Sequence, residues 1–327
     1  MATPLIPRTL ITLCGPTSSG KTKLSVEIAL RIHRDHGQDV TIISADSRQV
    51  YRYMDIGTSK TRPDEMRGIP HEMLDVIEPV RKLELEEYAR LARGQIQACI
   101  AAGRVPFVVG GTGVYVKALV EAWNVEKVGR ARESLRRDFP PAMIADAYST
   151  LRRLDRAAAS RVHPNNYEGV INALSRVVAR NNSSAEPDRP LIRPLLLGVD
   201  PGQRALDHRV AATYDDQVRR GLLDEIRSLN ARYDLERQFR DRGRGSSNQV
   251  LHTHGYREYF EVAGQRGIAV DGLTERDMST VRSRVVKHIQ GYTRRQRSWF
   301  RKLPGIRMVD SADHALQIIA RTATSGC

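Results

Sequence analysis

The stretch GPTSSGKT, residues 15–22, fits the pattern G-x-x-x-x-G-K-S/T of a phosphate-binding loop. Glycines at both ends let backbone N–H groups turn toward an anion, Lys21 adds a positive charge, and Thr22 can offer its hydroxyl to Mg²⁺. An apolar run precedes the loop and a helical pattern follows it, so a helix N-terminus adds to anion binding. The pattern predicts a phosphate or diphosphate site without specifying the reaction. Its residues are Gly15, Pro16, Thr17, Ser18, Ser19, Gly20, Lys21 and Thr22.

Two polar residues at the ends of later apolar runs could do chemistry beside this loop. Asp46 follows the run TIISA. From its position alone it is a helix N-cap, a magnesium-side carboxylate as in phosphate-loop kinases, or a general base. Thr112, in GGTG, is the polar side chain of that stretch that could reach a ligand. Its glycines alone are more typical of a tight turn between a strand and a helix.

Strand and helix patterns alternate over the first 120 residues. Apolar runs at 9–14, 39–47 and 105–113 predict strands, and amphipathic patterns at 21–37 and 85–103 predict helices. This alternation indicates an α/β fold, a P-loop NTPase-like parallel sheet flanked by helices. Ligands bind such sheets at the carboxyl ends of the strands. We therefore expect the phosphate loop, Asp46 and Thr112 to converge on one crevice.

The pattern changes to helix alone from about residue 123 to residue 190. We interpret this region as a small all-helical insertion domain that binds the acceptor. It would separate a first part of the catalytic core, residues 1–122, from a continuation with basic C-terminal helices, residues 191–327.

The chain has 327 residues and a net charge of +14, from 52 Lys and Arg against 38 Asp and Glu. This excess favours a polyanionic partner, and an arginine-rich surface that merely keeps the protein soluble is the alternative. Cys14, Cys99 and Cys327 show no paired spacing, which indicates a reducing compartment and no zinc site. No apolar stretch approaches the ~20 residues that span a bilayer, and the start of the chain leads directly into the phosphate loop. We expect a cytoplasmic monomer with no removable signal and no membrane partner.

Several motifs together resemble one enzyme family. GPTSSGKT, ISADSRQVYRYMDIGTSK, PHEMLD and VGGTGVYVKAL follow one another as in the tRNA dimethylallyltransferases, also called tRNA isopentenyltransferases. RVHPNN, DPGQRALDHRV, GYREY and TRRQRSWFRK extend the resemblance over roughly residues 8–310. The stretch ADSRQVYRYMDIGTSK is the most specific, because generic phosphate-loop kinases do not carry it.

The resemblance implies transfer of a dimethylallyl group from dimethylallyl diphosphate to N6 of an adenine. Asp46 would then be the base that accepts a proton from the amine, with Thr112 close to the same amine. The phosphate loop and Mg²⁺ would stabilise the leaving diphosphate, and Arg204 would reach the same group. Ser47, Arg48 and Gln49 would join Asp46 and Thr112 in contacting the acceptor nucleotide.

In family members that modify tRNA, the acceptor adenosine lies beside the anticodon and flips out of its stack into the enzyme. The helical insertion and the basic C-terminal helix would hold the anticodon arm. A solvated basic helix with an apolar core face is the alternative for that helix. Trp299 and Phe300 lie among its basic residues, which are Arg282, Arg284, Lys287, Arg294, Arg295, Arg297, Arg301 and Lys302.

The chain departs from the family pattern on the acceptor side. Glu72 follows His71 where a second histidine is usual, and neutral or altered residues replace usual ones at Asn166, Gly169, Asn172, Thr213 and Gln290. Either a tRNA enzyme has moved its contacts to other arginines, or the acceptor is a free adenine nucleotide such as AMP, ADP or ATP. A phosphate-loop kinase or NTPase and a non-catalytic RNA-binding protein are the hypotheses from other classes.

Overall fold

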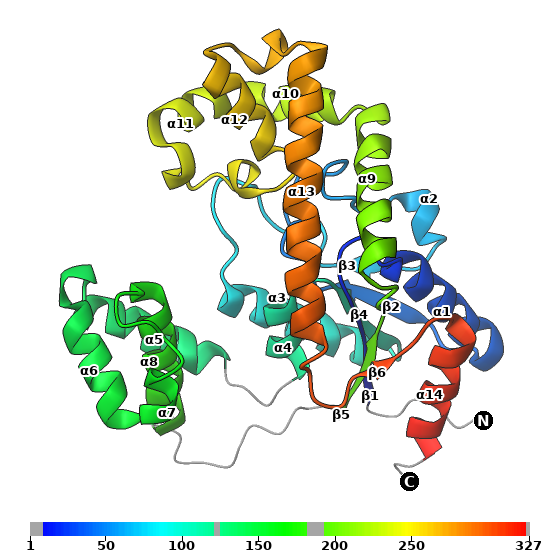
Figure 1. The fold of residues 1–327 in the computed structure, drawn as a ribbon. Coiled ribbons are helices and arrows are strands. Elements are labelled where there is room, and N and C mark those ends of the chain that lie inside the picture. The colour runs from blue at the N-terminus through cyan, green and yellow to red at the C-terminus, as the bar shows by residue number, and fades with distance from the viewer. Residues whose placement is uncertain (1–8, 121–124, 182–192, 325–327) are drawn as a thin grey trace.

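A parallel β-sheet forms the centre of the protein in the computed structural model, which describes residues 9–120, 125–181 and 193–324 (Figure 1). Within those residues the sheet has six strands in the order β3-β2-β4-β1-β5-β6, and every pairing is parallel. The strands are β1 (Thr9–Cys14), β2 (Val40–Ser44), β3 (His71–Glu72), β4 (Val105–Gly110), β5 (Arg193–Gly198) and β6 (Arg307–Met308). The predicted α/β fold with a parallel sheet is confirmed.

Both faces of the central strands β1, β2 and β4 are buried, which explains why these strands are largely apolar. Along β1, Ile11 and Leu13 point to one core while Leu10 and Cys14 point to the other. The first core is covered by α1 (Lys21–His36) and α14 (Ala312–Thr324). The second is covered by α3 (Leu85–Ala101) and α4 (Gly113–Val120), where the rings of Tyr88 and Tyr115 stack with centroids 3.6 Å apart.

A second helical layer stands on the carboxyl edge of the sheet (Figure 1). Its longest helix, α13, packs against both α9 and α12 and continues down to the sheet. The helices are α9 (Gln203–Arg219), α10 (Leu222–Tyr233), α11 (Leu235–Arg242), α12 (Arg257–Arg266) and α13 (Glu275–Phe300). Short turns of 3-10 helix join them at η2 (Gly243–Gly245), η3 (Gln249–His252) and η4 (Val270–Gly272), and α2 (Pro63–Met66) lies beside α1.

The predicted helical insertion appears as a separate cluster with its own apolar core. It consists of α5 (Val125–Asp138), η1 (Pro141–Met143), α6 (Ile144–Leu154), α7 (Arg156–Ala159) and α8 (Tyr167–Asn181). Arg132 joins it to the α/β core through an ion pair with Glu86 of α3, at 2.9 Å. The boundaries predicted at 122/123 and 190/191 lie outside the described residues, so they stay predictions.

The cysteines and the lengths of the helices are relevant to the expectations drawn from composition. Cys14 and Cys99 are buried free thiols, and burial raises the pKa of the Cys14 thiol to about 12, which makes it unreactive. Cys327 lies outside the described residues. Among the helices of the described residues, none is both long and apolar enough to cross a membrane.

The start of α13 provides a test of the helix on which the second layer depends. Thr274 accepts a hydrogen bond from the Asp277 backbone N–H, and the Asp277 carboxylate accepts one from the Thr274 N–H. Replacing Thr274 with Ala removes this capping box, so we expect the free energy of unfolding in urea to fall by about 1 kcal/mol. Thr280→Ala, on an exposed turn of the same helix, is the control. Equal losses in both variants would contradict the assignment.

Candidate active site

The phosphate loop lies between β1 and α1, as predicted. Gly20 has φ 92° and Ser18 has φ 61°, so the loop uses left-handed backbone conformations on both residues. Gly15 is needed for another reason: a Cβ there would lie 2.4 Å from the carbonyl oxygen of Val199. The loop borders a cavity of about 720 Å³, within the range of small-molecule sites. Six predicted diphosphate residues line it, namely Thr17, Ser18, Ser19, Gly20, Lys21 and Thr22.

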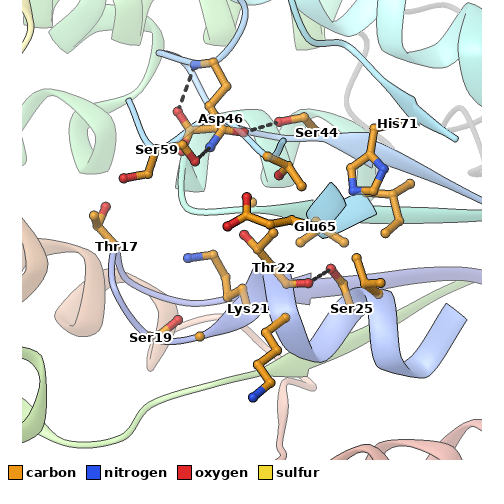
Figure 2. Close-up of a pocket in the computed structure, with 18 of the residues that line it drawn as sticks. Thr17, Ser19, Lys21, Thr22, Ser25, Ser44, Asp46, Ser59, Glu65 and His71 are labelled. Carbon is orange, nitrogen blue, oxygen red and sulfur yellow. Dashed lines mark hydrogen bonds between the residues drawn. The ribbon is translucent and has the colours of Figure 1, made fainter. Parts of the chain in front are cut away.

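The side chains of Lys21, Thr22 and Asp46 border the same cavity (Figure 2). The Lys21 ammonium donates a hydrogen bond to the carbonyl oxygen of Pro16 at 2.7 Å. Burial lowers the pKa of Lys21 to about 8, and the negative charge of Asp46 opposes this shift. The Ser19 hydroxyl is buried and has no hydrogen-bond partner within the described residues. A buried donor without a partner, beside a lysine, is what an anion would satisfy.

Asp46 closes the turn that follows β2 with its side chain. Its Oδ1 accepts hydrogen bonds from the backbone N–H groups of Arg48 at 2.8 Å and Gln49 at 3.4 Å. No helix begins here, so Asp46 holds a turn instead of capping a helix, and these bonds fix the orientation of the carboxylate. One oxygen is thereby occupied by the turn, while the residue still borders the cavity. A carboxylate held in this way can accept a proton from a ligand on its second oxygen.

Thr112 joins the segment that follows β2 to the segment that follows β4. Its Oγ1 accepts from the Ser47 N–H at 2.9 Å and lies 3.2 Å from the Ser47 hydroxyl, to which it donates. Its own N–H donates to the Ala45 carbonyl at 3.1 Å. Thr112 is 8% exposed. Thr112, Ser47 and Arg48 lie beside the cavity without being part of its lining, whereas Gln49 is part of it.

The side chain of Gln49 holds the opposite wall of the cavity. Its Nε2 donates to the carbonyl oxygens of Ser59 at 3.1 Å and Thr58 at 3.4 Å. Arg48 reaches away, to the Gln249 side chain at 3.3 Å. The predicted acceptor residues are thus brought together around the ends of β2 and β4.

Arg204 is not placed at the phosphate loop, in contrast to the expectation. It lies exposed in the first turn of α9 and is not among the residues that line the cavity. Arg209, further along the same helix, donates from Nη1 to the Ser19 carbonyl at 3.1 Å. The structure therefore favours Arg209 as the arginine that reaches the loop. Helical phase explains the difference, because residues 204 and 209 point in different directions.

Helix α13 contributes residues to which the motif TRRQRSWFRK assigned no place at the cavity. Gln296 accepts a hydrogen bond from the Thr17 N–H at 2.9 Å and donates to the Gly111 carbonyl at 2.7 Å. Trp299 packs on Gly113, where a Cβ would lie 2.4 Å from the indole. Tyr292, one turn before Gln296, has a pKa raised by burial and by the charge of Asp46. In the sequence, Gln296 and Trp299 belong to that motif and Tyr292 directly precedes it, but the motif did not indicate which side chains face the site.

The arginines of α13 are largely held by aspartates. Asp200 pairs with Arg297 at 2.7 Å and with Arg301 at 2.9 Å. Ion pairing with these guanidinium groups outweighs burial and lowers the pKa of Asp200. A shallow basic pocket of about 460 Å³ nevertheless remains between α9 and α13, lined by Gln203, Arg294, Arg297, Ser298, Arg301 and Lys302. One face of the helix packs on the core, and the other carries the positive charge.

The positions that depart from the family pattern fall in different places. Thr213 lines the cavity, and so does His71, which precedes the altered position Glu72 in β3. The Nδ1–H of His71 donates to the Ile69 carbonyl at 2.8 Å, and burial lowers the pKa of its ring. Gln290 joins α13 to the Asp207 carbonyl of α9 at 3.3 Å. Asn166, Gly169 and Asn172 belong to the start of α8 and the turn before it, in the helical insertion.

Two places among the described residues bring together atoms of the kind that bind metal ions. Thr22 borders the phosphate cavity, where its hydroxyl and the oxygens of a bound diphosphate would form a ligand set that suits Mg²⁺. His254, Glu258 and His288 bring three donor atoms together away from this cavity. There, Arg257 Nη2 lies 3.3–3.4 Å from all three donor atoms. The guanidinium supplies the positive charge at that cluster, which is an ion-pair network.

The fold and the site define a class of protein, a P-loop α/β protein with a cavity beside the loop and a carboxylate after β2, the next strand but one in the sheet. The sequence model of the IPP transferase family matches residues 49–303. The chain belongs to the IPP transferase family. Because the match begins at Gln49, it does not depend on the phosphate loop.

Individual relatives agree with this assignment over nearly their whole length. A tRNA dimethylallyltransferase of Geobacillus thermodenitrificans is 32% identical over 93% of this chain and 91% of that protein. One from Salinispora arenicola is 34% identical over 94% and 84%. The solved tRNA isopentenylpyrophosphate transferase of Bacillus halodurans is 28% identical, with a TM-score of 0.62 over 97% of this chain and 96% of that one. A solved eukaryotic dimethylallyltransferase acting on tRNA shares the fold, with a TM-score of 0.70 at 23% identity over 98% of this chain and 78% of that one.

The pKa of Lys21 leads to a test of anion binding. Lys21 is protonated below about pH 8 and loses its charge as the pH rises through that value. We therefore expect the affinity for inorganic diphosphate, measured by calorimetry, to fall above pH 8. The decline should approach about tenfold per pH unit. Arginine keeps its charge over this range, so Lys21→Arg removes the pH dependence. The same decline in both proteins would show that another group titrates.

Proposed function

We propose that this protein transfers a dimethylallyl group from dimethylallyl diphosphate to N6 of the adenosine beside the anticodon of tRNA. The observation that carries the proposal is the convergence of Lys21 and Asp46 on one cavity, at the ends of β1 and β2. The loop suits a diphosphate, and the carboxylate suits a neutral amine that must lose a proton. Membership of the IPP transferase family and the names of the relatives support the choice of donor and acceptor.

In the proposed reaction, N6 of adenosine attacks C1 of the donor. The N6–C1 bond forms, the C1–O bond breaks, and diphosphate leaves with the electron pair of that bond. Asp46 accepts the N6 proton on the oxygen that the turn does not occupy. The loop N–H groups and Lys21 stabilise the leaving diphosphate, and Arg209 holds the loop through Ser19. Thr112 keeps Ser47 in place beside Asp46.

Thr22 would hold Mg²⁺ together with the diphosphate. The bound ion would neutralise charge on the leaving group. Thr22 lies in the first turn of α1 and lines the cavity, which supports this role. We also propose that the protein works as a monomer in the cytoplasm.

Several features support a large RNA acceptor. The helical insertion has its own core, and the basic pocket between α9 and α13 lies on the same helix whose Gln296 contacts the phosphate loop. Arg294 and Arg301 are 57% and 62% exposed there, so their positive charge is accessible to phosphates. A free nucleotide would require neither feature.

The acceptor can be identified directly. We expect labelled dimethylallyl diphosphate to modify a transcript of the anticodon stem-loop and to leave AMP, ADP and ATP unmodified, as read by mass spectrometry. Product on AMP without product on RNA would overturn the choice of acceptor. Release of phosphate from ATP in the absence of prenyl donor would favour a kinase or NTPase.

The role of Asp46 is tested best by Asp46→Asn. The amide keeps an oxygen for the Arg48 N–H and removes the base, so the turn survives while proton transfer is lost. We expect the rate of prenyl transfer to fall by about 10²–10⁴-fold, with the affinity for RNA unchanged. Asp64→Asn, at a 69% exposed carboxylate paired with Arg62, is the matched control. Full activity of Asp46→Asn would exclude Asp46 as the base.

A further inference from the structure

The cavity wall that faces the phosphate loop belongs to an irregular segment. After β2 the chain continues through residues 45–62 without a regular helix or strand. Thr58, Ser59 and Thr61 of this segment line the cavity. In Figure 2, Ser59 and Asp46 lie on one side of the cavity, and Lys21 and Ser19 lie on the other. A wall without regular hydrogen bonding must be held by contacts from elsewhere.

Glu225, in the first turn of α10, holds this wall through its carboxylate. Its Oε2 accepts from the backbone N–H groups of Asp55 at 2.9 Å and Ile56 at 2.7 Å. Its Oε1 accepts from the Gly57 N–H at 3.1 Å. Three successive N–H groups thus converge on one carboxylate, which is a strong, charge-assisted arrangement.

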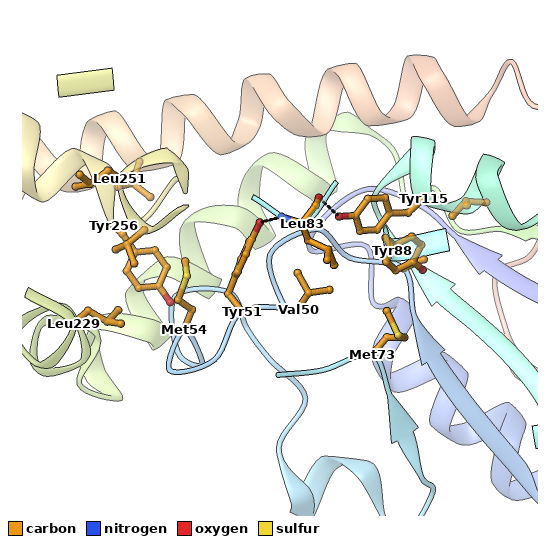
Figure 3. Close-up of a cluster of buried hydrophobic side chains, with 14 of the residues drawn as sticks. Val50, Tyr51, Met54, Met73, Leu83, Tyr88, Tyr115, Leu229, Leu251 and Tyr256 are labelled. Carbon is orange, nitrogen blue, oxygen red and sulfur yellow. Dashed lines mark hydrogen bonds between the residues drawn. The ribbon is translucent and has the colours of Figure 1, made fainter. Parts of the chain in front are cut away.

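Tyr256 fixes the carboxylate in turn. Its hydroxyl donates to Glu225 Oε1 at 2.7 Å, and its ring is completely buried. The ring also packs on Gly57, where a Cβ would lie 2.4 Å from it. Figure 3 shows Tyr256 beside Met54, within an apolar cluster that continues through Tyr51 toward the sheet. The segment therefore packs closely against the second helical layer at Gly57.

The remaining contacts act on the same few residues. Gln217 of α9 donates to the Gly57 carbonyl at 3.2 Å and to the Ser59 hydroxyl at 2.8 Å. Lys60 is buried and pairs with Asp75 at 2.6 Å, and it also pairs with Asp55. None of these contacts involves the phosphate loop, whose own contacts run to Gln296 and Arg209. Helix α9 reaches both sides of the cavity but through different residues, Gln217 at the wall and Arg209 at the loop.

We propose that Glu225 is a positioning residue that sets the cavity wall against which the prenyl chain of the donor lies. This inference rests on the proposed function for the identity of the donor. The diphosphate binds on the loop side, so the hydrocarbon chain occupies the space between the loop and the wall at Thr58–Thr61. Loosening the wall weakens binding of the chain and leaves binding of the diphosphate intact. Glu225 acts without touching the donor.

The test compares two ligands, dimethylallyl diphosphate and inorganic diphosphate, by calorimetry at pH 7. Glu225→Gln turns an amide NH₂ toward backbone N–H groups and removes the charge. We expect its affinity for dimethylallyl diphosphate to fall about tenfold, which corresponds to the loss of one charged hydrogen bond. Its affinity for inorganic diphosphate stays at the wild-type value. Tyr256→Phe keeps the ring on Gly57, loses the hydroxyl, and gives a smaller loss with the same selectivity.

Glu236→Gln is the matched control. Glu236 also accepts a backbone hydrogen bond in the helical layer, from the Val270 N–H at 2.7 Å, away from the cavity. Equal weakening of both ligands in Glu225→Gln, or no change in either, would overturn the proposal, as would the same selective loss in Glu236→Gln. If Glu225→Gln does not fold, Tyr256→Phe decides by the same criterion. A wild-type protein that binds the donor but modifies no RNA would refute the proposed function alone.

Discussion

The side chain of Gln296 connects the parts of the site that lie furthest apart in the sequence. It bonds to the phosphate loop at Thr17 and to the turn after β4 at Gly111. A glutamine amide has one acceptor and two donors, so it can serve an N–H and a carbonyl at once where a charged residue could serve only one. It is 6% exposed, and a buried amide of this kind tolerates little displacement of either partner. Because β1 and β4 already pair in the sheet as far as Cys14 and Gly110, docking of α13 determines how the two turns beyond these strand ends lie relative to each other.

Local patterns were sufficient to predict the phosphate loop, the strands around it, Asp46 and Thr112. Each of these depends on residues within about ten positions of one another, and parallel topology brings the strand ends together. Arg209, Gln296 and Glu225 could not be predicted in this way. Their roles depend on which face of a helix meets the core and on contacts across more than 160 residues. A single sequence carries no signal for such pairings apart from helical spacing.

The arginines that give the chain its positive charge fall into two groups, one held in close ion pairs and one more exposed. Arg297 and Arg282 lie in ion pairs at 2.7 Å, with Asp200 and Asp215, and help to fix α13 against its neighbours. Others, such as Arg294, have looser partners at 3.5 Å and higher exposure. One face of the basic C-terminal helix packs on the core and the other is exposed and basic, and contact of the exposed face with RNA stays a prediction. A tRNA-modifying enzyme needs the second group for its polyanionic substrate and the first to keep the catalytic core closed.

The close approach of Gly15 to the carbonyl of Val199 has a consequence for how the donor is captured. The phosphate loop is packed directly against the backbone that follows β5, with no side chain between them. It cannot swing outward unless the sheet itself deforms. A diphosphate bound as proposed would meet a preorganised cradle and spend little of its binding free energy on ordering the loop. Any adaptation to substrates of different size must come from the facing wall, so selectivity and anion affinity can change independently of each other in evolution.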